Sequence, residues 1–176
     1  VSDIDGTLND KQFNLPPNNK EAITRFVKNG GNFTLCSGRN LASLKKHYDK
    51  LGLETPAIFS NGAGIYDFKT KEYIFLDTLS VECEKMILDI FKNHKFTQLT
   101  VFGIDTIYLT KPTCFYGLAI SVLDKLDYKF CKSYNDLPTG MWTKASFFGS
   151  PSKVKKIQKL LKSDKYNKYF DCFLTS

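Results

Sequence analysis

The sequence predicts an α/β fold built on a parallel sheet, joined to a second unit of mixed α+β type. Two observations predict this class. Over residues 1–60, short apolar segments and amphipathic segments alternate as strand, helix, strand, helix, strand, an order typical of a parallel sheet with right-handed crossovers. From about residue 79 the order changes to one helix followed by paired strands. We therefore predict two domains, residues 1–79 and residues 80–176.

The elements of the first domain follow from periodicity and from the residues that start and stop them. A helix is predicted over residues 20–29, because apolar side chains recur there at helical spacing behind a cap at Asn18 or Asn19. A second helix over residues 40–51 has the same spacing and ends at Gly52. Short apolar segments predict strands, and two of them around a polar turn predict a hairpin. The remaining predictions are the strands 32–36 and 56–60, the hairpin strands 65–67 and 73–76, and the inward helix faces of Ala22, Ile23, Phe26 and Val27 and of Leu41, Leu44 and Tyr48.

The second domain is predicted to open with a helix over residues 81–95, which Ser80 can cap. A tight turn at residues 103–105 joins two short apolar segments and therefore predicts a hairpin. The apolar run 116–123 is predicted as a helix, although its short length leaves a strand open. The other predicted elements are strands at 98–102, 106–109, 127–132 and 143–148, a lysine-rich helix at 151–162, and a strand at 170–175.

The composition excludes several classes of protein. Hydrophobic residues make up 42% of the 176 residues, enough to bury a core, and no segment approaches the roughly 20 apolar residues of a membrane span. No basic-then-apolar leader is recognisable, so we expect a cytoplasmic protein with no membrane partner. The five cysteines, Cys36, Cys83, Cys114, Cys131 and Cys172, are scattered and lack CxxC spacing. We therefore predict buried free thiols, not disulfides or a zinc site.

The net charge of +7 at pH 7 comes largely from lysines, many of them in the helix predicted over residues 151–162. Such a surface can bind nucleic acid, and it also suits an anionic substrate such as a phosphate ester. The lysines are not interleaved with arginine and aromatic residues in a known binding motif. We therefore favour a solvated helix face and do not predict a nucleic-acid partner. The oligomeric state does not follow from the sequence.

Three predicted strands of the first domain end in small or polar clusters. These clusters are Asp3–Thr7, Ser37–Arg39 and Asn61–Gly64. In an open α/β sheet, ligands bind outside the carboxyl ends of the strands. We therefore expect the three clusters, far apart in sequence, to converge on one ligand site. Val1 is the only apolar residue before the first cluster, whereas a buried strand normally has several, so we expect further apolar residues upstream in the natural protein.

The first cluster places two carboxylates, Asp3 and Asp5, two residues apart. In an extended segment these side chains lie on the same side. Two like charges in a small volume are costly unless a cation or a proton lies between them. A hard divalent cation with oxygen ligands, and Mg²⁺ in particular, suits such a site when a phosphate is also bound. A turn with acidic capping residues is the alternative interpretation.

The cluster Asp3–Thr7 has the pattern DxDGT, which resembles motif I of the haloacid dehalogenase (HAD) superfamily of aspartate-nucleophile phosphatases. Ser37–Arg39 resembles motif II in the [ST]GR form of the Cof-type subgroup, and Asn61–Ala63 resembles the NGA of the same subgroup. With the α+β unit, these motifs resemble Cof-type phosphatases with a type IIB cap. The resemblance implies a partial HAD Rossmann-like parallel-sheet core with an inserted, here incomplete, α+β cap domain.

The resemblance also implies roles for individual residues. Asp3 is implied as the nucleophile and as a ligand of Mg²⁺, and Asp5 as the general acid and base and a second metal ligand. The implied phosphate-binding residues are Thr7, which also orients Asp5, Ser37, Gly38, Arg39, Asn61 and Gly62. Arg39 is expected either to contact the phosphate or to hold a neighbouring carboxylate. The alternatives are that Ser37 only caps a helix with Arg39 paired on the surface, and that Asn61-Gly62 is an ordinary hairpin turn.

The motif III lysine and the motif IV pattern GDxxND of the family do not occur in this sequence. We therefore expect the chain to be an incomplete version that is poorly active or inactive alone, with a phosphatase as its parent protein. The expected activity is Mg²⁺-dependent hydrolysis of a small phosphorylated metabolite, such as a sugar phosphate, pyridoxal phosphate or flavin mononucleotide. A phosphomutase is a lesser alternative. A non-catalytic protein that binds phosphate or nucleic acid on the same fold is the alternative from another class.

Four further residues lie outside these motifs. His47 and His94 lie in lysine-rich helical contexts with no partner at metal-ligand spacing, so both are expected on the surface. Trp142 is the only tryptophan, and its position allows either a core residue or one that faces a substrate. The sequence does not decide the role of Lys144.

Overall fold

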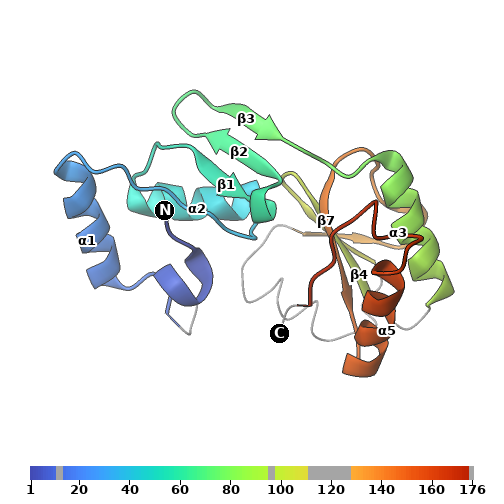
Figure 1. The fold of residues 1–176 in the computed structure, drawn as a ribbon. Coiled ribbons are helices and arrows are strands. Elements are labelled where there is room, and N and C mark those ends of the chain that lie inside the picture. The colour runs from blue at the N-terminus through green and yellow to red at the C-terminus, as the bar shows by residue number, and fades with distance from the viewer. Residues whose placement is uncertain (11–13, 95–97, 111–127, 175–176) are drawn as a thin grey trace. The chain divides into compact units, whose positions relative to one another are not determined.

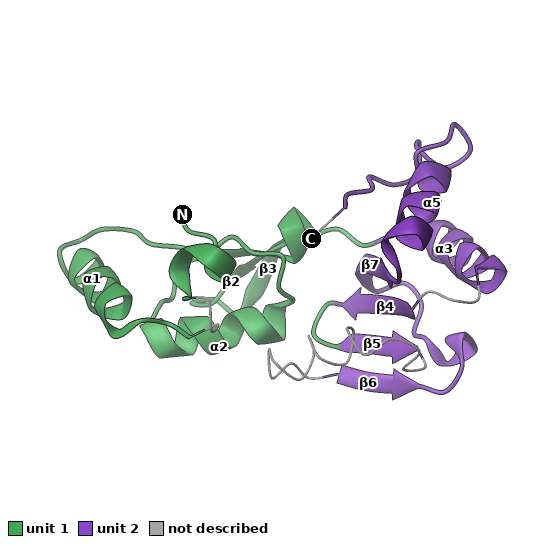
Figure 2. Ribbon diagram, turned by 90° about the horizontal axis from the view of Figure 1, so that it is seen from below, with its two compact units in different colours: residues 1–78, 104–106 green, residues 79–103, 107–176 purple. Residues whose placement is uncertain are grey.

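The computed structural model describes residues 1–10, 14–94, 98–110 and 128–174. The chain divides into two compact units (Figure 2), and each has its own hydrophobic core. Unit 1 comprises Val1–Thr78 with Ile104–Thr106, and unit 2 comprises Leu79–Gly103 with Ile107–Ser176. The main division therefore falls one residue before the predicted domain boundary.

The first three predicted strands of unit 1 pair in parallel, but each pair is joined by a single bridge. Ser2 bridges Leu35, and Cys36 bridges Ile58, both in parallel orientation. The Cys36 N–H donates to the Ser2 carbonyl at 2.9 Å, and the Ile58 N–H donates to the Leu35 carbonyl at 3.0 Å. The predicted parallel arrangement of these segments is thus present in the backbone hydrogen bonds.

Unit 1 continues from this parallel edge into an antiparallel sheet (Figure 1). The sheet has the order β1-β2-β3, and β2 and β3 form the predicted hairpin. The elements of unit 1 are the π-type turn η1 (Ile4–Leu8), α1 (Pro17–Lys28), α2 (Leu41–Leu51), β1 (Ala57–Phe59), the 3-10 turn η2 (Ser60–Gly62), β2 (Gly64–Asp67) and β3 (Glu72–Leu76).

Helix α2 supplies one side of the core of unit 1. Asn40 caps it by accepting the Ser43 N–H at 3.0 Å, and Gly52 ends it with a left-handed φ of 64°. Leu44 and Tyr48 are buried and pack with the buried residues Ile4, Leu8, Leu35, Ala57 and Phe59. This core anchors both the first turn of the chain and the end of β1. The predicted helix and its inward face are confirmed.

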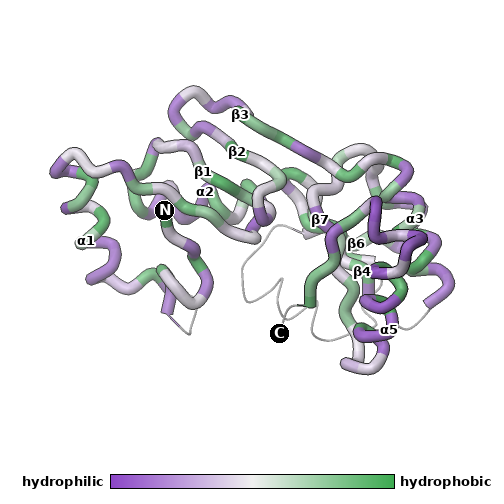
Figure 3. Tube along the Cα trace, in the orientation of Figure 1, coloured by the Kyte–Doolittle hydropathy of each residue, from purple (hydrophilic) through white to green (hydrophobic). Residues whose placement is uncertain are grey.

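Helix α1 departs from its prediction. It begins at Pro17, with Pro16 at the cap position, so neither Asn18 nor Asn19 caps it. Only Ile23 of the predicted apolar face is buried, whereas Phe26 is 51% exposed. The helix begins earlier than predicted because proline suits the first helical turn, where its missing N–H costs no hydrogen bond. Strand β3 also has exposed apolar side chains. Figure 3 shows that this strand is hydrophobic and that it follows a hydrophilic turn.

Unit 2 contains a four-stranded sheet with the order β6-β5-β4-β7, in which only the β5–β6 pair is parallel. Its elements are α3 (Val81–Asn93), β4 (Gln98–Gly103), β5 (Ile107–Thr110), β6 (Tyr128–Cys131), the 3-10 turn η3 (Tyr134–Asp136), β7 (Trp142–Phe148) and α5 (Pro151–Leu161). These agree with the predicted elements. Residues 116–123 lie outside the described residues, and the strand predicted to begin at residue 170 is wrong over 170–174.

The core of unit 2 packs α3 against the sheet. Ile87 of α3 meets the buried residues Leu99 and Val101 of β4 and Trp142 of β7. Trp142 is therefore a core residue. Glu84, on the same helix, is completely buried, and its carboxylate accepts the Gly140 N–H at 2.9 and 3.0 Å and the Trp142 N–H at 3.3 Å. This carboxylate ties α3 to the start of β7.

Two predictions from composition can be compared with the described residues. Cys36, Cys83, Cys131 and Cys172 are free thiols, of which Cys83 and Cys131 are buried. Cys114 lies outside the described residues. In the portion of the chain that the structure describes, no helix is both long enough and apolar enough to cross a membrane.

Candidate active site

The carboxyl ends of the three predicted strands are connected by backbone hydrogen bonds. The Ser2 N–H donates to the Thr34 carbonyl at 2.9 Å, which aligns the first segment with the second. The Ser37 N–H donates to the Ile58 carbonyl at 3.0 Å, and the Asn61 N–H donates to the Ser37 carbonyl at 3.1 Å. The three clusters therefore lie at one edge of unit 1, as their position after parallel strands predicts.

The first cluster is a tight turn anchored by two apolar side chains. Ile4 and Leu8 are buried, whereas Asp3, Asp5, Gly6 and Thr7 are exposed. The Asn9 N–H closes the turn on the Ile4 carbonyl at 2.8 Å. Gly6 has a φ of 77°, a left-handed conformation that glycine adopts without the steric cost of a Cβ atom. The turn thus presents the acidic pair outward from a fixed base.

Arg39 binds Asp5 through a two-point ion pair. Its Nη2 donates to Asp5 Oδ1 at 2.7 Å and its Nε to Oδ2 at 2.9 Å, while Nη1 donates to Ser43 Oγ at 3.0 Å. The Arg39 side chain is 9% exposed and that of Asp5 40%. Of the two roles predicted for Arg39, the structure has the contact with a neighbouring carboxylate. The alternative of a surface pair with Ser37 as the helix cap is wrong, because Asn40 caps α2.

Gly38 and Asn61 bring the second and third clusters together. A Cβ atom on Gly38 would lie 2.5 Å from Asn61 Oδ1, so no larger residue fits there without displacing the Asn61 side chain. Ser60, Asn61 and Gly62 have consecutive positive φ values of 49°, 59° and 96°. A non-glycine residue such as Ser60 pays conformational energy for this geometry, and such strain gathers at functional sites. Asn61 and Gly62 thus have the positive φ values that an Asn-Gly turn requires, and Ser60 adds a strained residue before them.

Ser37 is almost fully buried between these clusters. Its Oγ accepts the Arg39 N–H at 3.3 Å. The contacts thus join Asp5 with Arg39, and Ser37 and Gly38 with Asn61, while Asp3, Thr7 and Gly62 lie exposed. The structure therefore brings five of the predicted site residues into contact at the ends of the three segments, and the other three lie exposed beside them.

His47 is the residue that the sequence interpretation misplaced. It was expected on the surface, but it is 8% exposed, and its Nε2 lies 3.2 Å from Asn9 Nδ2. Burial lowers the pKa of the His47 ring below its ordinary value. The helical spacing offered a signal, because His47 falls on the same stripe as Leu44 and Leu51, both of which are buried.

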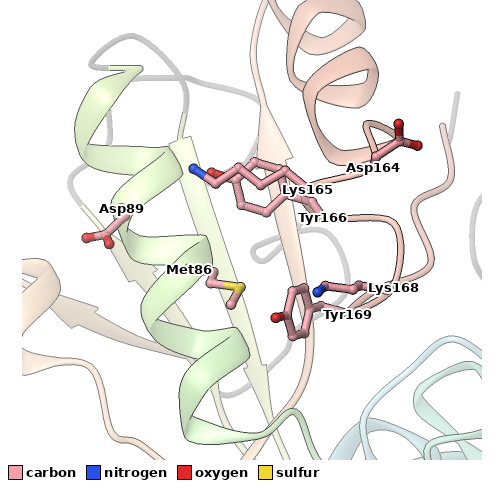
Figure 4. Close-up of a pocket in the computed structure, with 7 residues that line it drawn as sticks. All are labelled: Met86, Asp89, Asp164, Lys165, Tyr166, Lys168 and Tyr169. Atoms are coloured by element: carbon pink, nitrogen blue, oxygen red, sulfur yellow. The ribbon is translucent and has the colours of Figure 1, made fainter.

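The acidic side chains of the described residues do not gather into a group of three that could hold a metal ion. Asp3 and Asp5 remain the carboxylates that the motif contributes. A pocket of about 340 Å³ lies in unit 2, where Met86 extends from α3 toward two tyrosines (Figure 4). None of its lining residues belongs to the three clusters; they are Met86, Asp89, Asp164, Lys165, Tyr166, Lys168 and Tyr169.

Lys144 lies elsewhere in unit 2, on β7. Its Nζ is 4.2 Å from the centroid of the Phe102 ring, a cation–π distance. Burial lowers the pKa of the Lys144 amine. Its side chain is therefore part of the packing of the β4–β7 pair.

Comparison with protein families decides what this arrangement belongs to. Residues 1–175 match the family model of haloacid dehalogenase-like hydrolases. The chain belongs to this family. The resemblance predicted from the DxDGT, SGR and NGA clusters is thereby confirmed.

Individual members of the HAD family are similar over parts of their length. The chain is 30% identical over 111 residues to pyridoxal phosphate phosphatase YbhA of Escherichia coli, a match that covers 63% of this chain and 40% of YbhA. A haloacid dehalogenase-like hydrolase from Bacteroides thetaiotaomicron superposes with a TM-score of 0.89 at 18% identity, covering 99% of this chain and 66% of that one. The chain thus spans less than half of that phosphatase and about two thirds of that structure.

A further solved structure belongs to a named subclass of the HAD family. The subclass IIB sugar phosphatase BT4131 superposes with a TM-score of 0.73 at 17% identity, covering 89% of this chain and 60% of that one. At such identities the likeness shows the fold alone. The predicted fold class, an α/β core of the HAD type with an α+β unit, is confirmed.

Proposed function

We propose that this chain carries part of the active site of a Mg²⁺-dependent phosphohydrolase that acts on small phosphorylated metabolites. The observation that carries the proposal is the two-point pair of Arg39 with Asp5, at 2.7 and 2.9 Å. It links the DxDGT turn to the Ser37–Arg39 cluster, although 34 residues separate the partners. The alternative interpretation, a turn whose acidic residues only cap it, does not account for this link.

In the proposed reaction, a carboxylate oxygen of Asp3 attacks the phosphorus atom of the ester. The bond between phosphorus and the leaving oxygen breaks, and Asp5 donates a proton to that oxygen, so that an alcohol leaves and an aspartyl-phosphate remains. Asp5 then accepts a proton from water as the water oxygen attacks phosphorus. Inorganic phosphate is released and the Asp3 carboxylate is restored. Arg39 holds the Asp5 carboxylate in place through both of its oxygens, and one of these oxygens must leave the guanidinium fork when it carries the proton.

Other residues of the site would bind the phosphate. Ser37 and Gly38 precede α2, with Arg39 and the cap Asn40 between them and the helix, whose N-terminal N–H groups and dipole favour anions. The exposed Gly6 and Thr7 would allow the backbone to approach the phosphate closely. Asn61 and Gly62 would form the floor of the site beside Gly38.

The donor chemistry fits Mg²⁺. Asp3 is exposed at the edge where the phosphate would bind, and its carboxylate is a hard oxygen ligand. Both carboxylate oxygens of Asp5 contact Arg39, so in this arrangement Asp5 would contribute through its main-chain carbonyl. Such sites use one or two carboxylates together with water and substrate phosphate. When bound, the cation would offset negative charge on the transferring phosphoryl group.

The substrate class is inferred from relatives and from charge. YbhA is a pyridoxal phosphate phosphatase and BT4131 a sugar phosphatase. The chain has a net charge of +7, which favours the approach of anionic esters. We therefore propose small phosphate monoesters, with unit 2 acting as the cap that selects among them.

The proposal is tested by phosphate release from p-nitrophenyl phosphate, pyridoxal phosphate and a panel of sugar phosphates. The protein is expressed from its complete reading frame and assayed with Mg²⁺ and with excess EDTA. We expect turnover with Mg²⁺ and loss of at least about 100-fold in EDTA, because a metal cofactor supplies several kcal/mol of charge stabilisation. Equal activity under both conditions, or none on any ester, would contradict the proposal.

Replacing Arg39 by lysine tests the proposed orientation of Asp5. Lysine keeps the charge but lacks the planar fork, so it cannot hold both Asp5 oxygens and reach Ser43 as well. We expect kcat/KM to fall about tenfold, equivalent to about 1.4 kcal/mol of transition-state stabilisation. Arg25→Lys is a matched control, since Arg25 is the only other arginine and lies exposed on α1. An Arg39→Lys variant as active as this control would show that the fork has no role.

A further inference from the structure

Helix α2 contacts the DxDGT turn through two hydrogen-bonded arms that start one helical turn apart. The first arm is Ser43 Oγ, which accepts Arg39 Nη1 at 3.0 Å while Arg39 holds Asp5. The second is His47, which contacts Asn9 at the end of the same turn. Ser43 belongs to both arms, because its backbone carbonyl also contacts His47 Nδ1 at 3.3 Å. The two arms therefore reach both ends of the segment between Asp5 and Asn9.

The contacts of His47 match a neutral ring with its hydrogen on Nδ1. The Ser43 carbonyl can only accept, and it lies 3.3 Å from His47 Nδ1, which donates. In the amide orientation of the structure, Asn9 Nδ2 donates and lies 3.2 Å from His47 Nε2, which accepts. A ring that donates at one nitrogen and accepts at the other is neutral. His47 and Asn9 are only 8% and 5% exposed, so water does not readily replace either partner.

Asn9 in turn closes the turn that carries the acidic pair. Its backbone N–H donates to the Ile4 carbonyl at 2.8 Å. The neighbouring Leu8 carbonyl accepts Asn19 Nδ2 at 2.9 Å, which secures the same end of the turn. We propose that His47 is a positioning residue of this active site, whose neutral ring holds Asn9 and so fixes the turn that carries Asp5. This inference rests on the proposed function.

Protonation of His47 would reverse one hydrogen bond of this network. His47 Nε2 would then donate toward Asn9 Nδ2, which is also a donor. Asn9 Oδ1 is buried and has no hydrogen-bond partner among the described residues, so rotation of the Asn9 amide would present an acceptor instead. The network therefore has two alternative states, and the neutral ring selects the one in the structure.

The surroundings of His47 favour its neutral form on balance. Burial is the largest effect and lowers the pKa, the Ser43 carbonyl raises it, Arg39 and Lys50 lower it, and Asp5 raises it. The neutral ring is therefore maintained above the ordinary value of 6.5 and is lost only as the pH falls through the lowered pKa. The turn should accordingly hold its geometry at neutral pH and loosen in acid.

The first test follows the histidine ring protons by ¹H NMR as a function of pH. The chain has only two histidines, so the His47 resonances are assigned by their loss in His47→Gln. We expect the pKa of His47 to lie below the ordinary value of 6.5. In Asn9→Asp a carboxylate acceptor replaces the amide donor, and the proton affinity of His47 should rise at least about tenfold. Unchanged titration of His47 in Asn9→Asp would overturn the pairing.

The second test uses activity, because Asn9→Asp buries a carboxylate that could disturb folding. His47→Gln retains a side-chain oxygen that can accept from Asn9, but the glutamine side chain cannot titrate. This variant should keep most of kcat, and its pH–activity profile should lose the fall in acid that is due to His47. His47→Leu has no acceptor and should lower kcat about tenfold with little change in KM, since positioning acts on the chemical step. His94→Gln is the matched control and should behave as the unaltered protein.

The two tests separate the inference from the function on which it rests. A pH profile of His47→Gln identical to that of the unaltered protein, together with equal kcat values in His47→Gln and His47→Leu, would overturn the positioning role even in an active enzyme. Absence of hydrolysis in the unaltered protein would overturn the proposed function and the positioning role together. The NMR titration would then still decide whether His47 and Asn9 form the pair.

Discussion

Replacing Asp3 by asparagine is expected to lower kcat for phosphate esters by at least about 10³-fold, because it removes the proposed nucleophile. An amide oxygen is a far weaker nucleophile than a carboxylate, and it also loses the negative charge that a hard cation prefers. The fold should be unaffected. Asp3 is exposed, and the hydrogen bond from Ser2 Oγ to Asp3 at 2.8 Å ends on its backbone carbonyl, not on its side chain. Steady-state kinetics at saturating Mg²⁺ measures the loss.

Asp49→Asn is the matched control for this experiment. Asp49 lies on the surface of α2 in an ion pair with Lys45, and both side chains are more than 60% exposed. Such a pair contributes little stability, so this variant should keep full activity. Acid quenching during turnover should trap a phosphorylated protein from the unaltered chain and none from Asp3→Asn. A variant Asp3→Asn that retained a tenth of the activity or more would exclude Asp3 as the nucleophile.

The parts of the fold that the sequence predicts well are those set by local rules. Asn40 and Gly52 bracket α2 because a side-chain acceptor starts a helix and a left-handed glycine ends one. The β2–β3 hairpin follows in the same way from two apolar runs around a polar turn. The convergence of three strand ends was predictable too, since parallel strands place their carboxyl ends at one edge.

The parts that sequence reasoning missed depend on contacts between distant residues. The sequence limits the partner of Arg39 to a phosphate or a carboxylate. It does not identify Asp5, because the two residues are 34 positions apart and only the fold brings them together. His47 was assigned to the surface from its lysine neighbours, whereas its burial depends on Asn9, which is 38 residues away. For α1, helical spacing predicted an inward face, yet Phe26 is half exposed because burial depends on what packs against a helix, not on its periodicity.

Replacing Glu84 by leucine is expected to lower the free energy of unfolding of unit 2 by about 2 kcal/mol, because two N–H groups lose their acceptor and the one on Trp142 is buried. Leucine has a similar volume and fills the space, so the loss reflects hydrogen bonding more than a cavity. The affected groups are the N–H of Gly140 and the N–H of Trp142, which the carboxylate accepts at 2.9 to 3.3 Å. Glutamine keeps one acceptor but turns an NH₂ group toward a donor, so Glu84→Gln should lose about half as much.

Trp142 makes this prediction measurable in one unit of a two-unit chain. It is the only tryptophan and it is fully buried. Its backbone N–H donates one of the hydrogen bonds that the Glu84 carboxylate accepts. Its fluorescence during urea unfolding therefore reports unit 2, where a single transition for the whole chain could not be assumed. Glu82→Gln, an exposed acid in the first turn of the same helix, should change the free energy of unfolding by less than about 0.5 kcal/mol. If Glu84→Leu unfolded at the same urea concentration as Glu82→Gln, the buried carboxylate would contribute nothing beyond its volume, and the start of β7 would have to be held by packing around Trp142 alone.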